Sequence, residues 1–243
     1  MSSENLFIFI FLAFLTEILG TLGGFGSSMF FVPIASYFLD FHSVLGITAL
    51  FHVSSNITKI LFFRKGFDKK IILTLGIPAV VFVMVGAFLT RILDNKILEF
   101  LLAVFLIVAS SIFLVFKNLT LKPTLAHAIS GGIFSGLIAG LIGTGGAIRG
   151  LVLAAFGLRM EVFIATSAII DLAIDLSRSV VYSLNGYVHK DDLYLIPFLF
   201  LVSVSGTFFG KKILSVFSQE RFRRIVLILI LGMGISILIK NIM

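Results

Sequence analysis

Long apolar runs follow one another along almost the whole chain, separated by short polar segments. A bilayer core about 30 Å thick needs about 20 apolar residues for each helix that crosses it. Six runs predict single crossing helices, at residues 44–63, 71–89, 97–116, 162–184, 193–209 and 225–239. The pattern therefore predicts an all-α polytopic membrane protein.

Two further runs, residues 6–39 and 126–155, are too long for one straight crossing. As unbroken helices with a rise of ~1.5 Å per residue they would extend ~51 and ~45 Å. Glycine clusters interrupt both runs, as GGFGSSMFFVP at residues 23–33 and as GLIGTGGAIRG at residues 140–150. We expect each run to form a helical hairpin that is broken at its glycines.

The chain has the pattern of a duplicated membrane unit. Shifting the sequence against itself by 119 positions places Gly26 on Gly145 and Pro78 on Pro197, and the same order of one broken run and three single spans recurs. We predict two homologous membrane repeats, residues 1–120 and 121–243, within one integral transmembrane domain. Transporters are commonly built from such repeats, with the substrate site on interrupted helices at the repeat interface.

The basic loop residues distinguish parallel from inverted repeats. If each broken run crosses the membrane once, Lys and Arg divide about evenly between the two sides. If each run returns as a hairpin, twelve basic residues lie on one side and four on the other, in agreement with the positive-inside rule. The larger group is Arg64, Lys65, Lys69, Lys70, Lys117, Lys122, Arg159, Lys211, Lys212, Arg221, Arg223 and Arg224, and the smaller is Arg91, Lys96, Lys190 and Lys240. We therefore expect inverted repeats with both termini on the non-cytoplasmic side.

The composition supports the membrane assignment. Hydrophobic residues make up 59% of the chain and charged residues 13%, whereas a soluble domain carries roughly a quarter charged residues. The net charge of +7 comes from basic residues between apolar runs, where they anchor spans and do not suggest nucleic acid. The chain has no cysteine, which excludes disulfides, thiolate metal sites and thiol nucleophiles.

The glycine breaks are the first candidate site. Backbone that leaves the helix at membrane depth is tolerated only where it lines a cavity or is buried in protein. A helix that restarts after a break points free N–H groups and the positive end of its dipole into that cavity, which suits an anion. We expect these glycines and hydroxyl residues to line it: Gly24, Gly26, Ser27, Ser28, Gly143, Thr144, Gly145 and Gly146. The alternative for glycine in these runs is close helix packing, which we assign to Gly132, Gly136 and Gly140.

Ionisable side chains inside the spans are the second candidate site. They are Glu17, His52, Lys59, Arg149, Asp171, Asp175 and Arg178. An ionisable group at membrane depth is costly unless it is paired or hydrated, so it suggests function. His52, Asn56 and Lys59 share one helical face, and the offset of 119 places them on Asp171, Asp175 and Arg178. We expect these two equivalent stripes to face one central cavity.

The two stripes carry the groups that an anion carrier needs. We predict that Lys59, Arg149 and Arg178, with Asn56 beside them, bind an oxyanion, because the planar fork of arginine matches oxyanion geometry. Asp171 and Asp175 would hold these cations when the site is empty, and one of them or His52 would carry a coupling proton. The alternative is structural, with Asp175 and Arg178 simply pairing to join helices. This structural alternative is stronger for Glu17, because Glu17 has no equivalent ionisable residue in the second half.

The motifs resemble those of the TauE/SafE sulfite exporter family over essentially the whole chain. The resemblance rests on the glycine element and following Val-Pro at residues 24–33, its echo in the second half, and the pattern Thr48…Lys59…RKGFD at residues 64–68. It implies a secondary transporter of sulfite, sulfonates or related small organic anions, working as an exporter in the bacterial inner membrane. Ser27, Ser28, Arg149 and Val152 depart from the family pattern, which leaves the identity of the anion open.

We therefore predict a proton-coupled anion transporter that works by alternating access. A passive anion or proton channel is the alternative, because the same polar midplane could serve it. An intramembrane enzyme is less favoured, since two acids four residues apart on one helix are poorly placed to flank a scissile bond. The expected partners are a small anion, protons and the lipid bilayer, with a homodimer left open and no nucleic acid, metal or cofactor.

Overall fold

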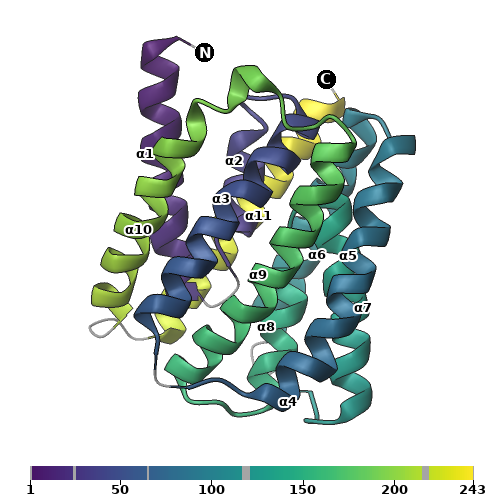
Figure 1. Cartoon of the computed structure of the whole chain (residues 1–243), viewed down its shortest axis with the longest axis vertical. Coiled ribbons are helices and arrows are strands. Elements are labelled where there is room, and N and C mark those ends of the chain that lie inside the picture. The colour runs from purple at the N-terminus through teal and green to yellow at the C-terminus, as the bar shows by residue number, and fades with distance from the viewer. Residues whose placement is uncertain (1, 24–25, 65, 117–120, 215–218, 243) are drawn as a thin grey trace.

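The computed structural model describes residues 2–23, 26–64, 66–116, 121–214 and 219–242, and the side chains of residues 219–223 lie outside this description. Every regular element in these ranges is a helix (Figure 1). Up to residue 116 the elements are α1 (Ser3–Gly23), α2 (Ser28–Ala35), α3 (Phe41–Phe62), α4 (Lys69–Ile71), the π-helical turn η1 (Ile72–Gly76), α5 (Ile77–Leu89), the 3-10 turn η2 (Thr90–Ile92) and α6 (Asn95–Val115). After it they are α7 (Leu125–Ile142), α8 (Gly146–Ala155), α9 (Met160–Leu184), the 3-10 turn η3 (Lys190–Asp192), α10 (Leu195–Leu214) and α11 (Gln219–Ile242).

The helix lengths fit a membrane protein, which confirms the predicted all-α class. Within the described ranges, seven helices are long and apolar enough to cross a bilayer: α1, α3, the continuous segment Lys69–Ile92, α6, α7, α10 and α11. The 25 residues of α9 also give it sufficient length. It carries the charged residues Glu161, Asp171, Asp175 and Arg178.

Short polar side chains in the loops begin four of the helices. Asp40 accepts a hydrogen bond from the backbone N–H of Ser43 at the start of α3, and Asp68, Asp94 and Thr124 cap α4, α6 and α7 in the same way. A side-chain oxygen at this position satisfies one of the free N–H groups of the first turn. The polar interruptions between apolar runs therefore fix where the spans begin.

Each of the two long runs forms a long helix followed by a short one, as the glycine clusters predict. α1 is followed by α2, and α7 is followed by α8. Gly143 ends α7 with a φ of 79°, and Gly26 precedes α2 with a φ of 83°. A side chain is strained in this left-handed conformation, so glycine is required at both breaks. Gly24 lies outside the described residues.

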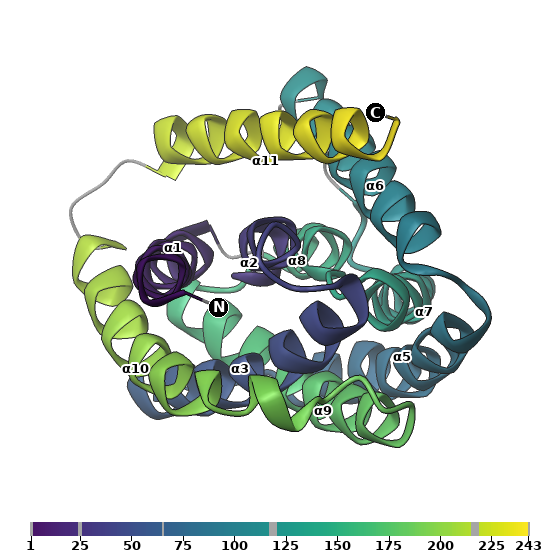
Figure 2. The same cartoon turned by 90° about the horizontal axis from the view of Figure 1, so that it is seen from above.

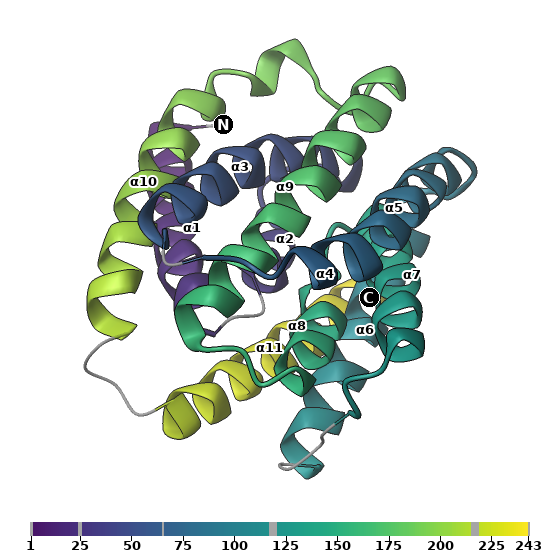
Figure 3. The same cartoon turned by 60° about the horizontal axis from the view of Figure 1, so that its bottom comes forward.

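Two pairs of helices run parallel and pack closely, α1 with α10 and α5 with α7 (Figure 3). In the first pair, Gly206 lies against Glu17 and Gly210 against Thr21. In the second pair, a Cβ atom on the α7 glycines would overlap backbone carbonyls: Gly132 with Leu75, Gly136 with Ala79 and Gly140 with Val83. This is the close packing expected of these three glycines.

Two other pairs run antiparallel, α3 with α9 and α6 with α11. The start of α3 meets the segment after α9, where the Ser43 hydroxyl lies 2.8 Å from Nδ1 of His189. At the opposite end, the Asp68 N–H donates to the Thr166 hydroxyl near the start of α9. In the other pair, Gly234 packs on Leu106. Lys240, which comes later in α11, contacts Glu99, which comes earlier in α6.

The short helices α2 and α8 lie in the interior of the bundle. Figure 2 shows them between the α3–α9 pair and the α6–α11 pair, with α1 and α7 on either side. The residues of α2 are almost all buried, and Phe31 packs against Phe9 of α1 and Phe51 of α3. The starts of α2 and α8 are thereby held in the middle of the protein, away from the lipid.

Candidate functional site

A polar cavity lies where the two helix breaks meet α3 and α9. Its volume is about 20 Å³, room for about one water molecule. Both halves of the chain contribute to its lining, which consists of Gly26, Ser27, Ser28, His52, Ser55, Asn56, Lys59, Ala139, Gly143, Gly145, Arg149, Asp171, Ile174, Asp175 and Arg178. The structure thus brings together the glycine breaks and both polar stripes.

The two stripes meet across the cavity at equivalent positions. Asn56 Nδ2 donates to Asp175 Oδ2 over 2.7 Å, and these residues are 119 positions apart. His52 and Lys59 of α3 are 6% and 7% exposed, and Arg178 of α9 is 2% exposed. The faces predicted to look inward are therefore buried against each other.

The breaks also contact each other directly. The Ser28 hydroxyl donates to the Thr144 hydroxyl over 3.2 Å. Thr144 is buried beside the cavity and does not belong to its lining, and Gly146 is the first residue of α8. A Cβ atom on Gly145 would overlap the carbonyl oxygen of Ser135. Close approach of the backbone therefore fixes the start of α8 at the cavity.

Each of the three buried cations described in this region has a carboxylate partner. Arg149 pairs with Asp171, and Arg178 Nη2 lies 2.7 Å from Asp175 Oδ1. Lys59 Nζ lies 2.8 Å from Glu17 Oε1. Burial of charge is costly unless it is paired with good geometry, so the pairs account for these residues in the membrane interior.

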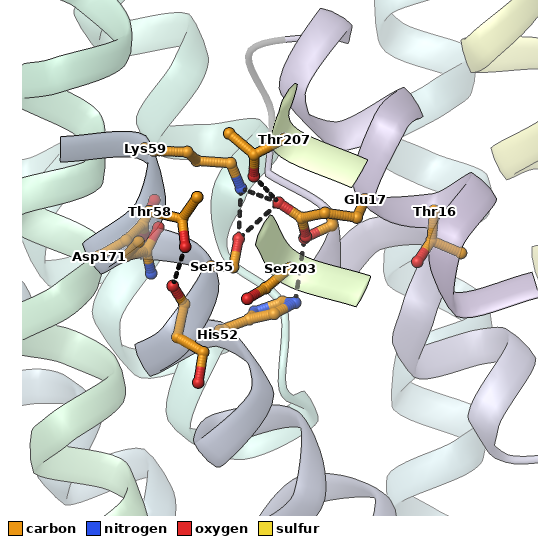
Figure 4. A network of polar contacts seen from close by, with 12 residues as sticks. Thr16, Glu17, His52, Ser55, Thr58, Lys59, Asp171, Ser203 and Thr207 are labelled. Carbon is orange, nitrogen blue, oxygen red and sulfur yellow. Dashed lines mark hydrogen bonds and ion pairs between the residues drawn. The ribbon is translucent and has the colours of Figure 1, made fainter. Parts of the chain in front are cut away.

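The partner of Lys59 differs from the one that we predict from the sequence. Asp171 and Asp175 do hold the two arginines, but Glu17 of α1 holds the lysine. The sequence offset places Gly136 opposite Glu17 and so hides this contact. Ser27 also binds Glu17. So do Ser55 and Thr207, which the sequence does not predict as site residues (Figure 4). Ser55 lies one turn before Lys59 on the same face, which is the signal that could have identified it.

Arg178 directs its donors at protein atoms. Its Nε donates to Asp175 Oδ1 over 2.7 Å, and its Nη1 donates to the carbonyls of Gly143 and Ala139 over 2.7 and 3.2 Å. The Tyr182 hydroxyl donates to the neighbouring carbonyl of Gly140 over 2.6 Å. The last carbonyls of a helix lack partners within it and favour a cation. Arg178 therefore caps α7 where the second break begins.

Arg149 has a different setting on α8. Its Nε donates to the Ser167 hydroxyl over 3.1 Å, and its Nη1 pairs with Asp171. Its Nη2 lies on the side of Gly26, within 3.7 Å of where a Cβ atom on that glycine would be. One edge of this guanidinium therefore faces the first break across the cavity.

A second small cavity continues from the first toward one end of the bundle. The two share Gly26, Asn56, Lys59 and Asp171. The second cavity extends to Phe163 and Ile164 in the first turns of α9, at the end opposite the two termini (Figure 1). Lys59 and Asp171 lie where the two cavities join.

Comparison with known proteins covers nearly all of the chain. A family model described as sulfite exporter TauE/SafE matches residues 9–237. A probable membrane transporter protein of Methanocaldococcus jannaschii is 28% identical over 257 residues, which is 96% of this chain and 95% of that protein. No solved structure matches. The matched region includes both breaks and every ionisable residue that lines the cavity.

Proposed function

Because the chain belongs to the sulfite exporter TauE/SafE family of membrane transporters, we propose that it carries small sulfur-containing or organic anions, such as sulfite and sulfonates, out of the cell across the inner membrane. The resemblance seen in the sequence motifs is confirmed by the family match. With seven candidate spans among its described residues, the chain is a multi-pass membrane transporter. Our proposal adds the class of anion, the direction of transport, the coupling to protons and the roles of the site residues.

The observation that carries the proposal is the small polar cavity at the two breaks. Arg149 and Lys59 line it, and each is held by a carboxylate that an entering anion can displace. Asn56, Ser27 and Ser28 add neutral donors, with Thr144 behind them. Gly26, Gly143 and Gly145 form part of its wall, and we propose that the free N–H groups at the start of α8, from Gly146 onward, also attract the anion.

We assign Arg178 to the wall of this site. All of its described contacts are to Asp175 and to carbonyls of α7, so an anion would have to uncap the helix to reach it. Arg149 keeps one edge toward Gly26 and is the better ligand for the oxygens of sulfite or a sulfonate. The transport is proton-coupled in this proposal, and the sequence offers Asp171, Asp175 and His52 as candidates for the coupling group.

We further propose that the two halves are inverted repeats related by a pseudo-twofold axis in the membrane plane. Exchanging the halves converts the parallel pair α1–α10 into the parallel pair α7–α5. The antiparallel pairs α3–α9 and α6–α11 each contain one helix from each half, so the exchange leaves both pairs unchanged. Equivalent helices of inverted repeats run in opposite directions, and such repeats commonly provide alternating access by moving against each other.

The size of the cavity favours a carrier over a passive channel. A space of about 20 Å³ holds about one water molecule, which is too small for sulfite with its three oxygens. Entry of the anion therefore requires the ion pairs to open and the walls to move. A conducting pore would need a continuous wet path.

The proposal is tested by flux into proteoliposomes. We expect saturable uptake of radiolabelled sulfite, inhibited by methanesulfonate more strongly than by acetate or sulfate and altered by a proton gradient. Arg149→Gln is expected to reduce this flux at least about tenfold, because the loss of one charge-assisted contact of about 1.5–3 kcal/mol has that effect. Arg91→Gln, at an exposed residue in η2, is the matched control.

Two results would refute the proposal. One is the absence of movement of all four anions by folded wild-type protein. The other is full sulfite flux through Arg149→Gln.

A further inference from the structure

Glu17 is a completely buried carboxylate that the proposed anion site does not use. It is 0% exposed and belongs to the lining of neither cavity. It lies behind Lys59 at the junction of α1, α3 and α10 (Figure 4). A carboxylate in this position needs an explanation, because an ionisable group inside a membrane protein is costly.

Four donors hold the two oxygens of Glu17. Oε1 accepts from Lys59 Nζ at 2.8 Å, from the Ser55 hydroxyl at 2.6 Å and from the Thr207 hydroxyl at 2.9 Å. Oε2 accepts from the Ser27 hydroxyl at 2.7 Å. The hydroxyls are neutral, so Lys59 supplies the positive charge. The carboxylate is stable as an anion here only while Lys59 stays beside it.

Lys59 also lines the anion cavity, so it has two competing partners. An anion that binds the ammonium group of Lys59 leaves Glu17 buried without a counterion. Removing one partner of a buried ion pair is strongly unfavourable, and uptake of one proton by Glu17 abolishes the charge. The protonated acid can still exchange hydrogen bonds with Ser27, Ser55 and Thr207.

A hydrogen-bonded route joins Glu17 to the cavity. Ser27 Oγ contacts Glu17 Oε2 at 2.7 Å and His52 Nε2 at 3.2 Å. Ser27 and His52 both line the cavity. A proton that enters the cavity can therefore reach Oε2 through these two side chains without opening the α1–α10 interface.

The other ionisable groups near this cluster have different constraints. Asp175 is held by both Asn56 and Arg178, which also caps α7. The Asp171 side chain is 17% exposed, so water can hydrate it when an anion takes Arg149. The groups that face Glu17 from the adjoining elements are Ser27 of α2, His52, Ser55 and Lys59 of α3, and Thr207 of α10. Of these three carboxylates, Glu17 therefore loses the most electrostatic stabilisation when its cation leaves.

Resting on the transport function proposed above, we propose that Glu17 is the proton-coupling site of the transporter. The carboxylate takes up one proton from the cavity as the ammonium group of Lys59 leaves Glu17 and forms an ion pair with the anion. It releases that proton when the anion leaves and Lys59 returns. The second half has Gly136 at the equivalent position, so the protein carries one such site. One proton then moves with each monovalent anion in the same direction, and the pair is electrically neutral. Net export therefore requires an outward anion gradient larger than the inward proton gradient.

The first test measures coupling in wild-type proteoliposomes with a pH-sensitive dye inside. Methanesulfonate is the main probe, because its single negative charge is constant through the neutral pH range. Sulfite, which itself binds a proton, serves to show that the protein is active. We expect one proton per methanesulfonate and no effect of an imposed potassium diffusion potential. Anion movement that is driven by the potential, by a sodium gradient or without proton movement overturns the proposal.

The second test compares Glu17→Gln with Glu99→Gln, which changes a carboxylate on α6 outside the site. We expect Glu17→Gln to keep exchanging anion across the membrane, because the neutral amide imitates the protonated acid, but at a rate that no longer changes with pH as it does in wild type. Accumulation driven by a proton gradient should be lost. The affinity of wild type for methanesulfonate should fall as the pH rises, because binding takes up a proton, whereas the affinity of Glu17→Gln should not change with pH.

The outcomes separate this assignment from the proposed function. Proton-driven accumulation by Glu17→Gln overturns the assignment alone, whereas failure of wild type to move either anion overturns the transport function and the assignment with it. If Glu17→Gln does not fold, Glu17→Asp provides the readout. Its shorter side chain keeps the acid, so coupling should persist with an altered pH profile, and an unaltered profile counts against Glu17.

Discussion

Arg178→Gln distinguishes an arginine that supports the cavity wall from one that binds the anion. Arg178 is 2% exposed, and its Nε and Nη2 both lie 2.7 Å from Asp175 Oδ1. Removing one partner of a buried ion pair costs about 3–5 kcal/mol. Asp175 keeps its hydrogen bond from Asn56, which favours the lower part of this range. The carbonyl of Gly143 loses its bond from Arg178, which adds about 1 kcal/mol.

We therefore expect Arg178→Gln to lower the free energy of unfolding by about 4 kcal/mol, from a typical total of about 5–15 kcal/mol. For a chain of this size the midpoint of thermal unfolding should fall by about 10 °C. The chain has 0 Trp and 0 Cys, so tryptophan fluorescence and thiol-reactive dyes cannot follow its unfolding. Far-ultraviolet circular dichroism in detergent measures the midpoint.

Two further variants interpret the result. Asp175→Asn combined with Arg178→Gln should be less destabilised than the sum of the single changes, because neither charge is left unpaired. Arg149→Gln should unfold closer to wild type, since its partner Asp171 is partly exposed. If Arg178→Gln unfolds within about 2 °C of wild type and still loses transport, our stability estimate is wrong and Arg178 belongs among the anion ligands.

Two further predictions concern packing and pH. Gly140→Ala should destabilise the protein by about 1–3 kcal/mol, because its Cβ would overlap the carbonyl of Val83; Gly232→Ala, which meets nothing within 4 Å, is the matched control, and equal melting of the two variants would contradict the packing. Burial raises the pKa of Asp40, but hydrogen bonds from Ser43 and the nearby His189 and His42 outweigh it, so the pKa lies below its ordinary value of 3.8. The ionised group therefore stabilises the fold above that value, and the stabilisation is lost as the pH falls through the lower folded-state pKa. Asp40→Asn, which keeps a capping side chain, should lack this acid-dependent loss in a melting series, and an identical loss in the variant would show that Asp40 is not its source.

The positions of the helices could be predicted from the sequence because they depend on local properties. Apolar runs set the lengths of the spans, Asp40 and Thr124 start helices, and the glycines at the breaks allow backbone conformations that other residues resist. The offset between repeats even placed Asn56 opposite Asp175. Helical periodicity and one repeat offset therefore account for much of the cavity lining.

The partners of the charged groups depend on packing that no local pattern reveals. Glu17 meets Lys59 because α1 and α3 converge beside α10. Arg178 reaches the carbonyls of Gly143 and Ala139 because α7 ends beside α9. In both cases the contact joins segments with no shared sequence signal, and the repeat offset gives Gly136 as the counterpart of Glu17.

The hydrogen bond between Asn56 and Asp175 bears on the ancestry of the chain. If the halves descend from one duplicated unit, this contact in the ancestor joined a residue to its own copy. Two aspartates there would have repelled each other in a dry environment, and two asparagines would have left Arg178 without its counterion. The present pair combines an amide donor with a charged acceptor, which identical subunits could not have offered at that point. On that descent, divergence of the two halves allowed a chemistry that a symmetric dimer of the ancestral unit was unable to adopt.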